Sequence, residues 1–271
     1  MSNWRSIVRA AGRPFTRRRR DGEDRGFLPD LRRDDDLFLV EFPKSGVTWL
    51  TFLMANVNLQ LSRDPRQVTF FNVNDFIPEL GGGYGGDHPL PVPGHRIFKS
   101  HSPFTRQYRK AFYLVRDPRD VMVSYAAFLN ELDWWRGGLD KLIAHPRYGI
   151  EAWAAHVGGW LDHVDAATSF TLIRYEDLLA DTAGELRRLY QLLGFALEDE
   201  LLATAIARSS MDRMRDSERL ARAGHPQRQA LTFVREGQAG GARAPLADHL
   251  RRAIEEKAGP MMERLGYTAA A

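Results

Sequence analysis

Cysteine is missing from all 271 residues of the chain. Its absence excludes disulfide bonds, thiolate catalysis and zinc or iron–sulfur sites with cysteine ligands, and it fits a reducing compartment. Runs of about 18 apolar residues, which a membrane-spanning helix needs, are also missing, as is the apolar core of a secretory signal. Histidines and carboxylates form no cluster with metal-ligand spacing. We therefore expect a cytoplasmic protein without a bound metal.

Acidic residues are missing from residues 1–20, which contain seven arginines. The remaining 251 residues carry 31 basic and 35 acidic side chains, so their formal net charge is −4, although that of the whole chain is +3. A broadly basic surface is typical of nucleic-acid binding, and this composition does not supply one beyond the first residues. We expect no nucleic-acid partner, and a local placement of the cations that bind any anionic ligand.

The basic N-terminal segment has two interpretations. Apolar side chains from Trp4 to Ala11 recur at helical spacing, which suits a short amphipathic helix on an anionic membrane surface, followed by the basic cluster Arg17–Arg20. The alternative is a solvated, disordered tail. Pro14 limits any helix to about the first dozen residues. We predict a flexible tail and linker over residues 1–36 and a single domain over residues 37–271.

Short apolar runs of β type alternate with helical patterns along the chain. This order predicts an α/β fold, a P-loop-like three-layer sandwich with a central, mainly parallel sheet flanked by helices. Breaker-rich sequence predicts a long loop over Gln67–Gly94, and residues 134–150 are expected to be irregular. The predicted strands are 37–40, Arg96–Ser100, Ala111–Val115 and Phe170–Tyr175. The predicted helices are Thr48–Leu61, Val121–Leu132, Glu151–Asp165, Thr182–Leu193, Glu198–Arg208 and Pro245–Lys257.

A compact turn follows the first predicted strand and leads directly into a helix. Backbone N–H groups and the helix dipole at such a helix start hold an anion, and Lys44 adds a positive charge. The turn has one glycine, which follows the lysine, so it is not the G-x-x-x-x-G-K-(S/T) loop of nucleotide triphosphatases. The Thr48 hydroxyl can bond a phosphate, and the Trp49 indole can stack on an adenine. The turn consists of Lys44, Ser45, Gly46, Val47 and Thr48.

Two further groups of polar residues stand at the ends of predicted strands. Arg116 ends one strand and Ser124 lies on the first turns of the next helix, so both can converge on one phosphate; the alternative is a helix entrance held by salt bridges. Lys99 and His101 are two residues apart at another strand end, so their side chains share a face. We expect both groups to line the crevice beyond the sheet edge.

These stretches together resemble motifs of the cytosolic-type sulfotransferases, which use 3′-phosphoadenosine 5′-phosphosulfate (PAPS). The first reads F-P-K-S-G-V-T-W-L and is similar to the family's 5′-phosphosulfate loop P-K-S-G-T-T-W, with Val47 in place of a threonine. The second, Y-L-V-R-D-P-R-D-V-M-V-S, resembles the 3′-phosphate signature Y-x-x-R-(N/D)-P-x-D-x-x-V-S. The third, K-S-H-S-P, resembles K-(S/T)-H-x-P. The chain is therefore identified as a bacterial-like member of this family over about residues 37–266.

Two later stretches extend the resemblance into the adenosine site. R-Y-E-D-L is similar to the family's R-Y-E-D motif, which implies that Tyr175 contacts the adenosine. S-S-M-D-R-M resembles the (S/T)-S-F-x-x-M stretch that lines the adenine pocket, which implies the same role for Ser209 and Met211. Met211 replaces the usual aromatic residue.

A C-terminal stretch implies a second clamp on the 3′-phosphate. It reads F-V-R-E-G-Q-A-G and resembles F-x-R-K-G-x-x-G. Arg235 and Gly237 match, whereas Glu236 stands where a lysine is common, which indicates a weaker or rearranged clamp. The donor-binding residues that the resemblance implies are Lys44, Ser45, Gly46, Val47, Thr48, Trp49, Arg116, Ser124, Tyr175, Ser209, Met211, Arg235, Glu236 and Gly237.

The resemblance also implies in-line sulfuryl transfer with 3′,5′-ADP as the product. His101 is expected to accept the proton of an acceptor hydroxyl or amine, and Lys44 to neutralise charge on the bridging oxygen. Lys99 is expected to share that electrostatic task, and Ser124 to restrain Lys44 besides binding the 3′-phosphate. Two alternatives stay open: a P-loop-type small-molecule kinase, and an inactive nucleotide-binding relative.

The acceptor is less defined than the donor. A small molecule, a glycan and a lipid all fit, and membrane contact through residues 1–20 would favour a lipid. The glycine-rich loop 81–94 is a candidate pocket wall, because long loops in compact domains are often functional. The sequence does not fix the oligomeric state. Aromatic residues that suit either a pocket wall or an ordinary core are Tyr125, Phe128, Trp134 and Trp135.

Overall fold

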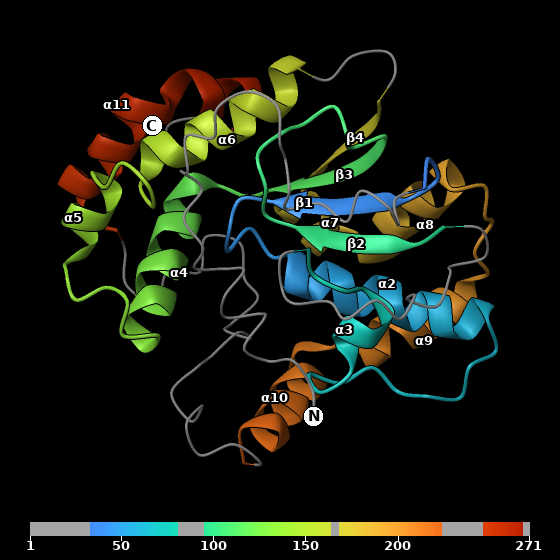
Figure 1. Cartoon of the computed structure of the whole chain (residues 1–271). Helices are drawn as coiled ribbons and strands as arrows, with labels where there is room; N and C mark the ends of the chain where they lie inside the picture. Colours follow the sequence, from blue (N-terminus) through green and yellow to red (C-terminus); the bar gives the residue numbers. More distant parts are fainter. Residues whose placement is uncertain (1–32, 81–94, 164–167, 224–245, 268–271) are drawn as a thin grey trace.

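A central parallel sheet organises the computed structural model, which describes residues 33–80, 95–163, 168–223 and 246–267 (Figure 1). The strands run in the order β2-β1-β3-β4, and each neighbouring pair is parallel. This confirms the predicted α/β fold with a parallel sheet flanked by helices. The strands are β1 (Leu37–Glu41), β2 (Ile97–Ser100), β3 (Lys110–Val115) and β4 (Ser169–Arg174).

Helices cover both faces of this sheet (Figure 1). Leu37 and Leu39 of β1 face one hydrophobic core, and Phe38 and Val40 face the other, because successive side chains of a strand alternate. All of β1 is therefore buried and its sequence is continuously apolar up to Glu41. The first core is covered by α2 (Val47–Leu61), α8 (Thr182–Leu192) and α9 (Asp199–Arg208), and the second by α4 (Pro118–Glu131), α6 (Ile150–His163) and α11 (Asp248–Arg264).

The carboxyl ends of the four strands meet at one edge of the sheet. The register pairs Val40 with both Ser100 and Tyr113, and it pairs Val115 with Arg174. In open parallel sheets this edge is where ligands bind. Each of the four motifs that the sequence places after a strand therefore begins at the same edge.

Four helices depart from the predicted elements. The structure has α3 (Val73–Phe76) inside the predicted loop Gln67–Gly94 and α5 (Leu139–Ile143) inside the predicted irregular stretch, so both predictions were wrong there. It also has α7 (Tyr175–Ala180), which begins where the fourth strand was expected to end, and α10 (Met211–Ala223), which was not predicted. Helices of one or two turns are too short for a periodic pattern, and the sequence of α10 is mostly charged.

The last helix, α11, is longer than predicted. It continues past the expected end at Lys257 and contains Pro260. Proline removes a backbone hydrogen bond from a helix interior. The helix persists because Ile254 and Met262, on either side of the proline, are both buried in the second core.

The predicted N-terminal tail lies mostly outside the described residues, which begin at residue 33. The described end of the predicted linker is anchored to the sheet. Asp36 forms an ion pair with Arg96 over 2.7 Å, and both side chains are buried. Because breaking a buried pair leaves one charge without its counter-ion, this pair fixes the entry of the chain into β1.

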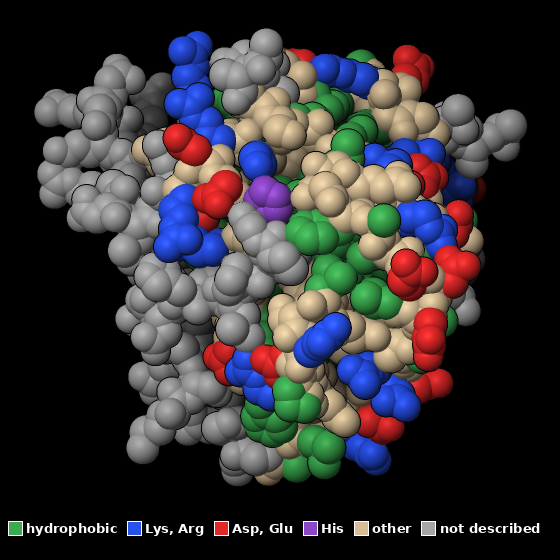
Figure 2. All heavy atoms as spheres, turned by 90° about the vertical axis from the view of Figure 1, so that its right-hand side faces the viewer, with side chains coloured by type: hydrophobic (Ala, Val, Ile, Leu, Met, Phe, Trp, Pro, Cys, Tyr) green, Lys and Arg blue, Asp and Glu red, His purple; other side chains and the backbone are tan. Residues whose placement is uncertain are grey.

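Charged side chains of both signs share the protein surface. On the face shown in Figure 2, Lys and Arg side chains are interspersed with Asp and Glu side chains. This agrees with the nearly balanced charge of the chain after its first 20 residues. In the described part of the chain, the structure has no helix of the length and apolarity needed to cross a bilayer.

Candidate active site

The turn after β1 is tight and self-supporting. The Ser45 hydroxyl and the Ser45 N–H both donate to the Phe42 carbonyl, over 2.9 and 3.2 Å. Lys44 and Gly46 have positive φ angles of 76° and 112°, and α2 begins directly afterwards at Val47. A strand, a turn and a helix start thus follow one another as the sequence predicts. The Ser45 side chain shapes this turn.

Gly46 is required by its surroundings. A Cβ atom at this position would lie 2.6 Å from Cδ2 of Tyr175, the first residue of α7. Real Cβ atoms do not approach another atom so closely. The turn and the Tyr175 ring are therefore packed against each other, which brings two of the predicted donor-binding residues together.

Further predicted donor-binding residues gather around Tyr175. The Trp49 ring meets the Tyr175 ring edge-on at a centroid distance of 5.9 Å, and the Trp49 Nε1–H donates to the Ser209 carbonyl over 3.2 Å. Asn56 of α2 donates to the Ser209 hydroxyl over 3.0 Å, a buried contact that the sequence analysis missed. Met211, the first residue of α10, packs against the same core. The structure thus brings together the residues predicted for the adenine pocket.

Arg116 joins this group from the end of β3. Its guanidinium carbon lies 4.4 Å from the centroid of the Tyr175 ring, and its Nη2 donates to Asp120 over 3.0 Å. Ser124 is half-buried on the same helix as Asp120. The helix entrance also carries the salt bridges of the alternative interpretation, because Arg119 pairs with Asp117 over 2.6 Å. The salt bridges at the helix entrance therefore coexist with the Arg116 cation beside Tyr175, which is predicted to contact adenosine.

Lys44 extends towards α4 from the turn. Its Nζ atom lies 4.3 Å from the centroid of the Phe128 ring. An ammonium group above an aromatic face is attracted by the ring's quadrupole. Phe128, which the sequence offered as an acceptor-pocket wall or a core residue, is buried and holds the Lys44 side chain near the sheet edge. The expected restraint of Lys44 by Ser124 stays a prediction.

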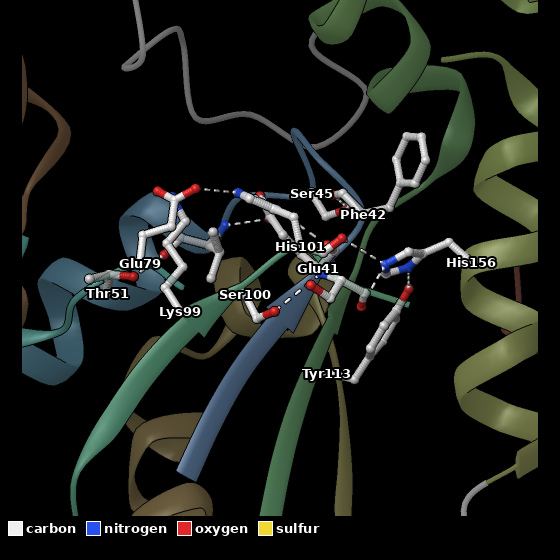
Figure 3. A network of polar contacts seen from close by, with 12 residues as sticks. Glu41, Phe42, Ser45, Thr51, Glu79, Lys99, Ser100, His101, Tyr113 and His156 are labelled. Carbon is white, nitrogen blue, oxygen red and sulfur yellow. Dashed lines mark hydrogen bonds and ion pairs between the residues drawn. The ribbon is translucent and has the colours of Figure 1, made fainter. Parts of the chain in front are cut away.

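Lys99 and His101 meet at one buried carboxylate, as Figure 3 shows. The Lys99 Nζ lies 3.0 Å from Oε2 of Glu79, and the His101 Nε2 lies 3.5 Å from Oε1 of Glu79. The shared face expected for the two residues is thus present. Glu79 was missed because it lies in the segment predicted as a loop, where no pattern marks a buried residue. Its strand-like bridge to Lys99 places it there.

The other nitrogen of His101 faces Glu41. The His101 Nδ1 lies 3.3 Å from the Glu41 carbonyl oxygen, which only accepts, so Nδ1 carries the proton and Nε2 is the basic nitrogen. Burial and the positive charge of Lys99 hold the pKa of His101 well below its usual 6.5, against the opposing hydrogen bond to Glu41. The imidazole is therefore neutral at neutral pH, the form that a general base needs.

A second buried histidine fixes the backbone of the first. The His156 Nε2 donates to the His101 and Ser102 carbonyls over 3.2 and 3.1 Å, and its Nδ1 accepts from the Tyr113 hydroxyl over 2.8 Å. This network links α6 and β3 to the segment after β2 (Figure 3). Burial lowers the pKa of His156 to about 4, so its neutral form is the stable one. No motif in the sequence marks His156 as part of this network.

Several predicted residues lie outside the described part of the chain. They include the glycine-rich loop 81–94 and residues 1–20. Of the aromatic candidates for the acceptor pocket, Tyr125 is buried in the second core and Trp134 is exposed. In the described ranges, no group of three or more potential ligands could hold a metal ion. The predicted clamp residues that also lie outside are Arg235, Glu236 and Gly237.

Comparison with known proteins gives a consistent result. A family model described as the sulfotransferase domain matches residues 34–266. Sulfotransferase 2A1 of Rattus norvegicus is 30% identical over 203 residues, which covers 69% of each chain. The 3-beta-hydroxysteroid sulfotransferase of Cavia porcellus is 28% identical over 241 residues, which covers 79% of this chain and 82% of its own. These relatives are mammalian, so they lend no support to a specifically bacterial-like member.

Solved structures show the same fold at low sequence identity. Retinol dehydratase in a complex with retinol and PAP superposes with a TM-score of 0.65 at 20% identity, over 86% of this chain and 82% of its own. A mouse sulfotransferase complexed with PAP superposes with a TM-score of 0.61 at 19% identity, over 88% of this chain and 89% of its own.

Proposed function

This chain belongs to the sulfotransferase domain family, and we propose that it transfers the sulfuryl group of PAPS to the hydroxyl group of a small apolar acceptor such as a steroid. One observation carries this proposal. At the carboxyl ends of the strands lie the turn after β1, the Arg116 guanidinium above the Tyr175 ring, and His101, whose pKa burial lowers well below 6.5. A donor that lies across this edge would present its sulfuryl group to the histidine.

The donor would be held at three points. The turn from Lys44 and the start of α2 would bind the 5′-phosphosulfate, with the Thr48 hydroxyl as an added donor. The cluster of Trp49 and Tyr175 would bind the adenosine. Arg116 and Ser124 would bind the 3′-phosphate, which distinguishes this nucleotide from ATP and ADP. The C-terminal clamp predicted from the sequence would add to this third point.

Transfer would proceed by in-line displacement, with the enzyme supplying position and charge. Lys44 would neutralise the negative charge that grows on the bridging oxygen as the phosphate leaves. Lys99 would contribute to the same field, although its pairing with Glu79 at 3.0 Å reduces its effect. His101 Nε2 would accept the proton of the acceptor hydroxyl.

The names of the relatives support an apolar alcohol as acceptor. The Cavia porcellus relative is named for a hydroxysteroid, and retinol dehydratase was solved with retinol. Both names point to a rigid or extended hydrocarbon that carries one hydroxyl. Three further proposals rest on the sequence alone. They are an amine, a glycan or a lipid as the acceptor, contact of residues 1–20 with a membrane, and a cytoplasmic location.

The test is turnover of PAPS with a panel of hydroxysteroids, retinol, phenols, sugars and amines, followed by mass spectrometry of the products. We expect sulfated products from hydroxysteroids. His101→Ala should bind 3′,5′-ADP as wild type does and should lose at least about 10²-fold in kcat. His163→Ala, at an exposed histidine of α6, is the matched control and should keep wild-type turnover. Wild-type turnover by His101→Ala, or no sulfated product from any acceptor, contradicts the proposal.

A further inference from the structure

Glu41 connects the turn to the histidine, and the family motifs assign it no role. It is the last residue of β1 and is 3% exposed. Its Oε2 accepts the N–H of Val47, the first residue of α2, over 2.7 Å. Its Oε1 lies 3.7 Å from the Nδ1 of His101, and its carbonyl oxygen lies 3.3 Å from the same nitrogen (Figure 3). One buried residue thus touches both halves of the site.

We propose that Glu41 is a positioning residue for the base: it holds the His101 ring with Nε2 turned towards the acceptor and stabilises the imidazolium that forms during transfer. This inference rests on the proposed role of His101 as the general base. The Glu41 carbonyl, 3.3 Å from Nδ1, fixes the tautomer and the ring orientation, and the Glu41 carboxylate, 3.7 Å from the same nitrogen, favours the protonated ring through its charge. The Val47 N–H keeps this carboxylate in place.

The balance of the step shows what Glu41 must do. The acceptor O–H bond breaks, and its proton forms a bond with Nε2 of His101. The acceptor oxygen forms a bond with sulfur, and the bond between sulfur and the bridging phosphate oxygen breaks, which leaves its electron pair on that oxygen near Lys44. A neutral imidazole thereby becomes a cation in a buried site. Glu41 gains and loses no bond and supplies the opposite charge.

The surroundings of His101 make such a charge necessary. Burial lowers the pKa of the His101 ring most, and the positive charges of Lys99 and Lys44 and the neighbouring His156 lower it further. Glu79 faces the Nε2 side at 3.5 Å, but its other oxygen already pairs with Lys99. Glu41 is the carboxylate on the Nδ1 side, where the acceptor does not compete for space.

Glu41 is partly ionised near neutral pH. Burial raises the pKa of Glu41 to about 7, with a smaller rise from Glu79, and the rise is limited by Lys99, by the Val47 N–H and by Lys44. A proton that arrives on His101 adds a cation beside Glu41 and favours its ionised form further. The carboxylate is thus most strongly charged when the imidazolium exists.

The same position gives Glu41 an opposite effect on the donor. Its carboxylate occupies the N–H of Val47 at the helix start, where the 5′-phosphosulfate would bind, and it repels that anion. Neutralising Glu41 should therefore tighten nucleotide binding while it slows transfer. A residue with a purely structural role would weaken both.

The test compares Glu41→Gln with wild type in kcat and in the Kd of 3′,5′-ADP. Glutamine keeps an oxygen that can accept the Val47 N–H and removes the charge. We expect kcat to fall at least about 10-fold, which is typical when a residue that orients a functional histidine is replaced. The Kd of 3′,5′-ADP should stay the same or decrease. Glu200→Gln, an exposed carboxylate of α9, controls for the change in total charge and should match wild type.

A double-mutant cycle separates this inference from the proposed function. In a His101→Ala background, Glu41→Gln should change kcat less than about 2-fold, because Glu41 acts through the ring. The inference is overturned by unchanged kcat in Glu41→Gln, by an equal loss of kcat in both backgrounds, or by a higher Kd that accompanies the loss of kcat. None of these results contradicts sulfuryl transfer. Wild-type turnover by His101→Ala overturns the proposed function itself.

Glu41→Asp keeps the test decisive if Glu41→Gln does not fold. This variant keeps the charge and shortens the side chain. We expect it to retain more of the wild-type kcat than a folded neutral variant, Glu41→Ser, at equal protein concentration. Equal kcat values for Glu41→Asp and Glu41→Ser overturn the inference.

Discussion

Lowering the pH should destabilise this protein through His156, whose burial dictates a neutral ring. The ring is enclosed between Tyr113 and the carbonyls of His101 and Ser102, and burial lowers its pKa from 6.5 to about 4. In the unfolded chain the ring titrates at its ordinary pKa. Between these two values the unfolded state binds a proton that the folded state does not, so stability falls as the pH falls.

The magnitude follows from these two pKa values. At pH 8 the ring is neutral in both states and makes no contribution. At pH 5 the unfolded ring is almost fully protonated and the folded ring is almost fully neutral, which costs about 2 kcal/mol of unfolding free energy. Well below pH 4 the full difference of about 3 kcal/mol is lost. The pKa of His101 is lowered as well, so it acts in the same direction.

The assay is urea unfolding at 25 °C, at pH 8 and at pH 5, for wild type and His156→Gln. Glutamine can still donate to the carbonyls but does not titrate, so the variant should lose about 2 kcal/mol less than wild type between the two pH values. Contributions from groups distant from His156 occur in both proteins and cancel in this difference. His163→Gln, at an exposed site on the same helix, should follow wild type. Equal losses in wild type and His156→Gln would refute the reasoning.

Two further predictions concern the turn and the base. Gly46→Ala places a methyl group 2.6 Å from the Tyr175 ring at a φ of 112°, so it should cost about 1–3 kcal/mol of stability and weaken 3′,5′-ADP binding in calorimetry; wild-type affinity contradicts this close packing. Because the pKa of His101 lies well below 6.5 and the neutral ring is the base, His101 should not limit kcat between pH 8 and 6.5; in Glu41→Gln, which lacks the carboxylate whose pKa is about 7, kcat should stay constant over this range, and a loss with its midpoint above 6.5 in that variant contradicts the assignment.

Sequence reasoning succeeded where the local pattern and the topology act together. The run that ends at Glu41 is buried on both faces, so it is apolar throughout and is visible as a strand. Parallel strands then bring all the segments that follow them to one edge, which is why Lys99, His101 and Arg116 could be placed at the same edge of the sheet. Two-residue spacing at a strand end was enough to predict that Lys99 and His101 share a face.

Contacts between distant segments could not be predicted in this way. Glu79 reaches the site through a single strand-like bridge, and His156, which lies on α6, is 55 residues after His101 in the sequence. Neither residue has a local pattern that separates it from a surface polar residue. Glu41 stood beside the recognised turn, but only the fold shows that its carboxylate turns back to the start of α2.

Calorimetric binding of 3′,5′-ADP and 5′-ADP to the full chain tests the central claim most directly. If Arg116 and its neighbours bind a 3′-phosphate, 3′,5′-ADP should bind at least about 10-fold more tightly than 5′-ADP, because a charged hydrogen bond contributes about 1.5–3 kcal/mol. Arg116→Met should remove most of this preference and leave 5′-ADP binding nearly unchanged. Equal affinity of wild type for the two nucleotides would contradict the account of this protein as a PAPS-dependent sulfotransferase.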